Sequence, residues 1–479
     1  MANKGIWKRL DEFEGDKMVL MIALLLILIS LLAIFSSTSL LAIEKHTSRM
    51  KIMGQQVFIA AGGMVAMLAC YSIKKVRLLR ILAQCGFFLS LLMLLFLMAH
   101  MNLGFIRAAS FNHAWRIISI FGFQLHVFEF VKILMVLYVA WACQAYEKNE
   151  FTLLPRLAER WNQPWMDRPF SRQVFYIWGP IFVTVALELV GSGSSALFLL
   201  LICTATALIG GISVRRLILP GLLAVSILGL GAVGINRFTD GKVLPRLETW
   251  TNRLMSHDRE QETVHAKKAW LAAKGIEERT RMREAYQKVL DENRQPLSAK
   301  IAVKEGGFIG KGPGKSSQRY VVSVMFGDYM YSFLVEEYGL LGGILVILLY
   351  LSLLARGSII ARNCTTTFAK TAVAGLVVMI TGQAFLHICI NVDLGPLTGQ
   401  TLPMISHGNS SFLAFSMAFG ILLSISRMAK KGIRREASRL DPLMERDEVS
   451  ERMEELDRME EMADIQEEEA LEEQEENFE

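Results

Sequence analysis

The chain has 479 residues, 52% of them hydrophobic, and a formal net charge of +5. Its mean hydropathy of +0.36 excludes an ordinary soluble enzyme and indicates a protein that crosses a membrane several times. None of the six cysteines belongs to a Cys-x-x-Cys motif, so the sequence predicts neither a disulfide framework nor a cysteine metal site.

Apolar runs predict ten membrane-spanning helices, because a stretch of about 20 apolar residues is long enough to cross the hydrocarbon layer. The predicted fold class is therefore an all-α polytopic membrane protein. The ten runs are 18–38, 54–73, 79–100, 124–143, 174–190, 194–213, 217–236, 330–355, 369–391 and 410–427.

The distribution of Lys and Arg orients these spans, since basic residues collect in short cytoplasmic loops. Basic clusters precede the first span, follow the last, and lie between spans two and three, four and five, six and seven, and eight and nine. We therefore expect both termini to be cytoplasmic and the protein to lie in the cytoplasmic (inner) membrane. The loop after the first span, with Lys45, Arg49 and Lys51, is an exception.

Four regions follow from this topology. Residues 1–17 form a cytoplasmic N-terminal segment, and residues 18–430 form the membrane domain. Within the domain, a large external loop, residues 237–329, lies between spans seven and eight. Its part from 258 to 290 is rich in Ala, Glu, Lys and Arg and predicts a surface helix.

The cytoplasmic tail, residues 431–479, becomes strongly acidic from position 441. From there it carries nineteen acidic residues against three arginines, a net charge of −16. Such a block is typical of a solvated tail, although a narrow apolar edge is also compatible with a helix that binds a partner.

Two of the predicted spans carry a pair of closely spaced ionisable residues in their apolar run. Glu129 and Lys132 are three positions apart in the fourth span and share one helix face, whereas Glu336 and Glu337 lie in the eighth. A charge within the bilayer costs roughly 2.5 to 3.5 kcal/mol on insertion scales, so each calls for a partner or a function. The pair in the fourth span could be purely structural.

Asp328 lies where the eighth span meets the outer surface. Considered alone, such a residue is an interfacial anchor or a helix N-cap. The external loop leads to it through residues 306–318, which contain five glycines ahead of Ser316 and Gln318. Glycines expose backbone amides that can bind phosphate, although the spacing here is not that of a P-loop.

Residues 391–411 form a Gly/Pro-rich polar loop between two strongly apolar runs. Irregular backbone at a bilayer edge leaves amides unpaired unless it is buried in protein or lines a wet cavity. The alternatives are a rigid turn between helices and part of a site.

This loop resembles the C-terminal signature of the SEDS family (shape, elongation, division, sporulation), which includes the FtsW and RodA peptidoglycan polymerases. The resemblance lies in Leu402-Pro403, residues 406–411 and residues 422–427. The glycine-rich segment is similar to the family's G-G-x-x-G-x-G-x-G-x-S-x-Q loop, and Trp115-Arg116 with Glu129 and Lys132 is similar to another family element. Two positions depart from the family pattern: His126-Val127-Phe128 stands where Gln-Pro-Ser is usual, and Gly191-Ser192 where many members carry Pro-Asp.

The resemblance implies a glycosyltransferase that polymerises lipid II, with inversion and with undecaprenyl pyrophosphate as the leaving group. Asp328 is the catalytic base by this likeness. The other expected substrate-binding residues are Arg116, Glu129, Lys132, Gly312, Gly314, Lys315, Ser316, Gln318, Arg319, Pro403, Ser406, His407 and Ser410.

The resemblance also implies an active site at the outer face and a class B penicillin-binding protein transpeptidase as partner, among other division proteins. No nucleic acid is expected to bind, no metal ligands are assigned, and a divalent cation is the one cofactor left open. The N-terminal run favours FtsW-like division over RodA-like elongation. A lipid II flippase is the main alternative, because a carrier also needs intramembrane charges.

Overall fold

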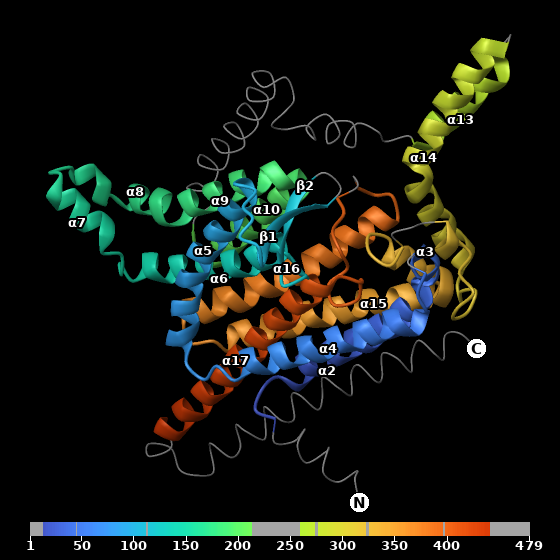
Figure 1. Cartoon of the computed structure of the whole chain (residues 1–479). Coiled ribbons are helices and arrows are strands. Elements are labelled where there is room, and N and C mark those ends of the chain that lie inside the picture. The colour runs from blue at the N-terminus through green and yellow to red at the C-terminus, as the bar shows by residue number, and fades with distance from the viewer. Residues whose placement is uncertain are drawn as a thin grey trace, which may run out of the picture.

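The computed structural model describes residues 13–44, 46–111, 114–212, 259–273, 276–321, 325–395 and 398–440. Within these ranges the chain forms a bundle of long helices with one small sheet (Figure 1). The predicted seventh span, residues 217–236, and the acidic tail from 441 lie outside the described residues.

In the described part of the chain, eight helices or helical runs are long and apolar enough to cross a membrane. The shorter α10 (Gly193–Ile209) is also apolar. The eight are α2 (Lys17–Ser37), α4 (Arg49–Tyr71), α5 (Val76–Met98), α6 (Val127–Glu147), the run Pro169–Gly191, α15 (Met330–Arg362), α16 (Thr367–Asn391) and Asn409–Ile433 of α17 (Asn409–Leu440). The prediction of a polytopic helical membrane protein is thus confirmed, whereas the number ten stays a prediction.

The run Pro169–Gly191 is built from α8 (Pro169–Gln173), the π-helical turn η2 (Val174–Trp178) and α9 (Gly179–Gly191). The remaining described helices are short or lie outside the bundle. They are α3 (Ser39–Glu44), α7 (Leu153–Arg160), η1 (Pro164–Asp167), α13 (Arg259–Ala272), α14 (Ile276–Gly306) and η3 (Gln318–Tyr320).

Helices α6, α16 and α17 form the centre of the bundle. Their apolar stretches are 78%, 67% and 83% buried, against 28% for α4 and for α5. Helix α17 packs along α4, α16 packs against α15 and α6, and α5 packs on α6. Polar side chains on the three central helices are therefore shielded from lipid and have to find their partners within the protein.

A three-stranded antiparallel sheet follows α5, so the prediction of an all-α fold is wrong. Strands β1 (Ile106–Phe111), β2 (Ala114–Ile120) and β3 (Phe123–His126) pair in the order β1-β2-β3. Phe121 and Gly122 join β2 to β3, and both have positive φ, as a two-residue type I′ hairpin requires. The predicted fourth span begins at Val127, directly after this sheet.

The predicted surface helix is confirmed, as two helices rather than one. Helices α13 and α14 pack together, with the rings of Trp270 and Tyr286 stacked 5.7 Å apart. Figure 1 shows them reaching away from the bundle, while the C-terminal part of α14 returns to pack on α15. This end of α14 leads directly into the glycine-rich segment.

Candidate active site

Asp328 is partly buried and lies two residues before the start of α15. Its neighbours come from the end of α16 and from the Gly/Pro loop. The side-chain amide of Asn391, at the end of α16, donates to the Asp328 carbonyl over 3.1 Å. The Asn391 Oδ1 atom accepts from the backbone and the hydroxyl of Ser332, at 2.9 and 2.8 Å. One side chain thus fixes the backbone of Asp328 to the first turn of α15.

The Gly/Pro loop packs on the same segment, as the site interpretation requires. The Ser406 hydroxyl donates to the Gly327 carbonyl (2.8 Å), and the His407 amide donates to the Phe326 carbonyl (2.8 Å). A Cβ placed on Gly399 would lie 3.6 Å from Oδ2 of Asp328. The loop backbone at Gly399, where φ is +63°, therefore lies directly beside the carboxylate.

Lys132 is buried beneath this loop, with 1% of its surface exposed. Its Nζ atom pairs with Glu129 (2.9 Å) and donates to Oε1 of Gln383 (2.6 Å) and of Gln400 (3.1 Å). An ammonium group has three donors, and two of them are engaged by the amide oxygens of Gln383 and Gln400, while the Glu129 carboxylate supplies the opposite charge. In this conformation Lys132 supports the loop from below through its bond to Gln400.

Gln400 connects the two charged groups. Its side chain accepts from Lys132, donates to Ser195 (2.9 Å), and its carbonyl accepts from Nδ1 of His387 (2.7 Å). Its neighbour Gly399 is the residue beside Asp328. Adjacent Cα atoms are about 3.8 Å apart, so a single short segment joins the environment of Asp328 to that of Lys132.

The sheet carries two further residues of this region, Arg116 in β2 and His126 at the end of β3. The His126 amide donates to Oγ of the buried Ser410, at the start of α17 (2.8 Å). Burial lowers the pKa of His126, the positive charge of Arg116 lowers it further, and Glu129 opposes both. Arg116, His126 and Glu129 are therefore near enough to interact electrostatically, although His126 departs from the family pattern.

The glycine-rich segment is occupied by carboxylates. Oε1 of Glu337 accepts from the amides of Gly314 (3.0 Å) and Ser316 (3.4 Å), and Oε1 of Glu336 accepts from the amide of Ser317 (2.8 Å). Arg319, only 8% exposed, lies 3.8 Å from Glu337. These expected phosphate-binding groups are thus already bound to the protein in this conformation.

The other expected substrate-binding residues divide between the two regions. Lys315 is exposed and makes no ion pair with any residue that the structure describes. The Gln318 amide lies 3.4 Å from Oε1 of Glu336, and the carbonyl of the buried Pro403 accepts from Tyr350. The structure therefore gathers Arg116, Glu129, Lys132, Pro403, Ser406, His407 and Ser410 around the Gly/Pro loop with Asp328. It places Gly312 to Arg319 in a separate network.

Sequence reasoning missed a polar stripe on α16. Gln383, His387 and Asn391 recur every four residues and all face the core, where they bond the Gly/Pro loop and the start of α15. Their spacing within an apolar run is the signal that could have revealed them. Glu188 was also missed: it is fully buried, and among the described residues neither of its oxygens has a hydrogen-bond partner.

A cavity of about 130 Å³ lies beside His407, lined by Leu41, Thr47, Lys51, Ile52 and Gln55. Small-molecule sites in proteins usually measure about 300 to 1,000 Å³, so this cavity is too small for a disaccharide. Its place between α4 and the Gly/Pro loop nevertheless leaves His407 partly accessible.

Comparison with known proteins gives matches over nearly the whole membrane domain. The model of the FtsW/RodA/SpoVE cell cycle proteins matches residues 16–276 and 263–431. The stage V sporulation protein E of Bacillus subtilis is 25% identical over 422 residues, which span 87% of this chain and 98% of that protein.

Two further relatives match over a shorter stretch. The probable peptidoglycan glycosyltransferase FtsW of Caulobacter vibrioides is 36% identical over 133 residues, 28% of this chain and 34% of that protein. The peptidoglycan glycosyltransferase MrdB of Escherichia coli K12 is 33% identical over 152 residues, 30% of this chain and 41% of that protein.

Solved structures share the fold. The crystal structure of the rod shape determining protein RodA of Thermus thermophilus superposes with a TM-score of 0.52 at 18% identity, covering 86% of this chain and 97% of that one. A chain of a peptidoglycan synthase complex that coordinates polymerization and crosslinking gives a TM-score of 0.53 at 19% identity, with 87% and 98% covered. The family match, which covers far more than half of the sequence, carries the assignment: the chain belongs to the FtsW/RodA/SpoVE family of cell cycle proteins.

Proposed function

We propose that this chain is a peptidoglycan glycosyltransferase that joins lipid II units into glycan strands at the outer face of the cytoplasmic membrane. Relatives in the same family carry the name peptidoglycan glycosyltransferase. The single observation that carries the proposal is the meeting of Asp328, at the mouth of α15, with the Gly/Pro loop at Gly399.

The reaction needs a base beside the acceptor sugar. The 4-hydroxyl of the acceptor's N-acetylglucosamine attacks the anomeric carbon of the donor's N-acetylmuramic acid, with inversion, and undecaprenyl pyrophosphate departs. Asp328 takes the proton of the attacking hydroxyl, a role commonly worth about 10² to 10⁴ in rate. Asn391 and Ser406 hold the backbone on either side of this carboxylate.

The reaction also needs positive charge beside the departing pyrophosphate. Lys315 is the exposed cation of the glycine-rich segment and supplies direct contact. Lys132, oriented by Glu129, acts through its field from beneath the loop, because its side chain is buried and bound to Gln383 and Gln400. Arg116 adds a further charge beside the sheet, and His407 shapes the outer wall.

The buried charges also fit a second function, the movement of lipid II across the membrane. Glu129, Lys132 and Glu188 lie inside the bundle, where a carrier would place coupling groups. Such a carrier would transfer labelled lipid II between the leaflets of a vesicle without lengthening it. Glycan synthesis from substrate supplied on one side favours the polymerase.

We propose a class B penicillin-binding protein as the partner. We also propose that the protein serves septal synthesis in cell division, with RodA-like elongation as the alternative. One structural neighbour comes from a complex described as coordinating polymerization and crosslinking. Depletion of the protein tests the duty, because loss of septation gives filaments whereas loss of elongation gives rounded cells.

The activity is tested by incubating the purified protein, with its partner transpeptidase, with fluorescent lipid II. We expect a ladder of glycan strands on gels. Absence of any product longer than the substrate, with the partner present and with or without added divalent cation, would contradict the proposal. The comparison with added cation also answers the open question of a metal cofactor.

A further inference from the structure

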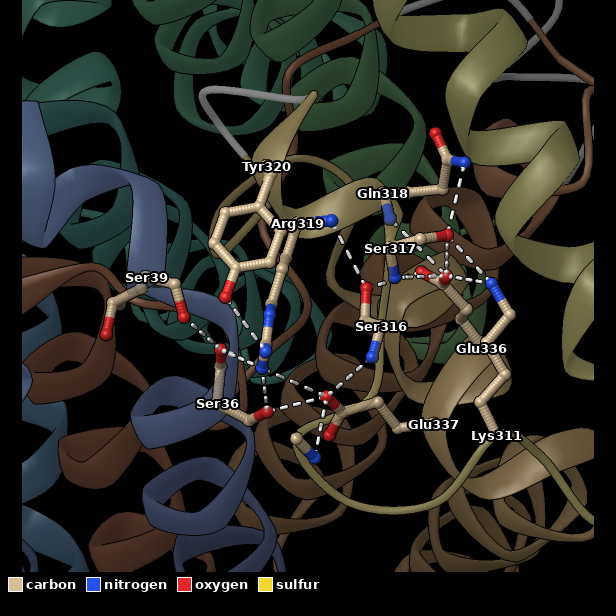
Figure 2. A network of polar contacts seen from close by, with 12 residues as sticks. Ser36, Ser39, Lys311, Ser316, Ser317, Gln318, Arg319, Tyr320, Glu336 and Glu337 are labelled. Atoms are coloured by element: carbon tan, nitrogen blue, oxygen red, sulfur yellow. Dashed lines mark hydrogen bonds and ion pairs between the residues drawn. The ribbon is translucent and has the colours of Figure 1, made fainter.

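The side chains of Glu336 and Glu337 point to the two sides of the segment 311–319 (Figure 2). We infer that the two glutamates hold this segment closed against α15 and thereby position the part of the chain that contains Asp328. We call the two glutamates, with their bonds to residues 311–319, the carboxylate brace. The inference rests on the proposed function. It assigns Glu336 and Glu337 as positioning residues of that same site.

Glu336 is fully buried, and the hydrogen bonds of its side chain all go to the segment. Its Oε1 atom accepts from Nζ of Lys311 (2.7 Å) and from the amide of Ser317 (2.8 Å), and its Oε2 atom accepts from the Ser316 hydroxyl. Lys311 also bonds the exposed Glu305 at the end of α14. The Glu336 carboxylate therefore joins α15 to the segment and, through Lys311 and Glu305, to α14.

Glu337 serves the other side of the segment and reaches the first span. Its Oε1 atom accepts from the Ser36 hydroxyl near the end of α2 (2.6 Å) and from the amide of Gly314 (3.0 Å). Arg319 supplies the matching charge and also lies 3.3 Å from the Ser36 hydroxyl. Each glutamate is thus matched by one cation from the segment, and α2 is tied to the same network.

The backbone beneath the brace is built for close approach. Helix α15 is interrupted at Gly339, where φ is +71°, and a Cβ there would lie 2.2 Å from the Phe308 carbonyl. The amides of Lys311 and Gly312 bond the carbonyls of Glu336 and Glu337 at 2.9 Å, and the Leu340 amide bonds the Gly307 carbonyl at 2.9 Å. Residues 307–312 and the interrupted part of α15 therefore satisfy each other's backbone hydrogen bonds where the helix is broken.

Asp328 lies within the loop of chain that this brace closes. Ser317 and Glu336 are 19 residues apart in sequence and are joined across the base of the loop, while Asp328 lies between them. Closing a loop reduces the conformations available to the residues inside it. Asn391 and Ser406 hold Asp328 directly, and the brace restrains the two segments that enter and leave it.

If the segment instead bound phosphate, the same substitution would change KM and kcat differently from what the brace predicts. If the amides of Gly314, Ser316 and Ser317 bound pyrophosphate in competition with the carboxylates, removing a carboxylate would lower KM. If the carboxylates hold the segment closed, removal frees it, lowers kcat and leaves KM nearly unchanged. The two readings therefore differ in which kinetic constant moves and in its direction.

The test compares Glu336→Ala and Glu336→Gln with Glu305→Gln, which alters only the exposed contacts of Glu305 with Lys311 and Ser317. In Glu336→Ala we expect the amides of residues 314–318 to exchange hydrogen at least about tenfold faster, with α6 and α16 unchanged, because only the brace is opened. We expect kcat to fall about tenfold with KM within about twofold, and Glu336→Gln to retain part of the rate because its shape is preserved.

The inference is overturned by unchanged exchange at residues 314–318, by a fall in KM, or by an equal effect of Glu305→Gln. Failure of the proposed function is a separate outcome, because wild-type protein would then make no glycan while its exchange pattern still reports on the brace. Loss of protection throughout α6 and α16 in both Glu336 variants would show general unfolding and would also refute a local positioning role.

Discussion

Lys132 shows how a full charge is accommodated inside this bundle. Three oxygens from α6, α16 and the Gly/Pro loop surround its Nζ atom, and the ring of Phe198 lies 5.3 Å away. A buried ion is tolerated only when its hydrogen-bonding capacity is met. The Gly/Pro loop is therefore tied to the centre of the bundle by a charge, although it lies at the bundle's outer end.

Replacing Lys132 by Met is expected to lower the free energy of unfolding by about 3 kcal/mol, because the carboxylate of Glu129, whose side chain is only 12% exposed, loses its ion pair. The measurement is the unfolding midpoint in detergent with increasing denaturant. Lys300→Met is the matched control, since it removes an ion pair to Asp393 whose lysine is 38% exposed. A surface pair is worth at most about 1 kcal/mol, so an equal loss in both variants would contradict this account.

Gly399→Ala is expected to lower polymerisation about tenfold, since a φ of +63° strains alanine and a shifted backbone would move against Asp328. The rate with labelled lipid II is the readout. Gly62→Ala is the control, because a Cβ at that helical position meets nothing within 4 Å. Unchanged activity in Gly399→Ala would show that the loop does not set the position of the carboxylate.

The sequence indicated that Glu336 and Glu337 need partners, but it could not say which. Their partners lie in a segment some 20 residues earlier and in the first span, some 300 residues away. The same holds for Gln400, whose role depends on Lys132 from another helix. The sequence shows which side chains are ionisable or polar, whereas the residues that they bind depend on how the helices pack.

At the scale of elements, apolar run length predicted eight of the spans that the structure describes, because the bilayer imposes a fixed thickness. The sheet at residues 106–126 was missed, since its strands are short and its turn is Phe-Gly rather than the usual Asn-Gly. Helix α15 also departs from a simple span. Its interruption at Gly339 exists because residues 307–312 pack against its backbone, and a hydropathy pattern cannot show that contact.

Gly339→Ala is expected to destabilise the fold by about 3 kcal/mol, because its Cβ would lie 2.2 Å from the Phe308 carbonyl and neither backbone can retreat easily. Thermal unfolding in detergent measures the loss. Gly54→Ala, where nothing lies within 4 Å, should be neutral. Equal stability of the two variants would mean that α15 tolerates a regular helix at position 339.

The orientation of the elements is tested by accessibility. In a cysteine-free background, a cysteine replacing the exposed Lys268 of α13 should react with an impermeant maleimide added to intact spheroplasts. One replacing Glu150, after α6, should react only after lysis, because the basic clusters place that end in the cytoplasm. The reverse pattern would invert the topology and move the candidate site to the wrong face.

At the scale of the whole molecule, networks at both ends hold the bundle together. At the end opposite the brace, Asp16 caps α2, pairs with Arg356 of α15 (2.9 Å) and bonds Ser426 of α17. At the other end, the Gly/Pro loop and the brace meet the first turns of α15, and the sheet meets the start of α17. The polar groups that we assign to catalysis are thus concentrated toward one end, as expected for an enzyme working at one membrane face.

The most direct test of the central claim is the glycan-polymerising rate of Asp328→Asn, measured with labelled lipid II and the partner transpeptidase. Asp393→Asn is the matched control, because Asp393 lies just after α16 and its carboxylate pairs with Lys300 at 2.6 Å. We expect Asp328→Asn to fold normally and lose at least about 10² in rate, while Asp393→Asn keeps its activity. Full activity in a correctly folded Asp328→Asn protein would contradict the account.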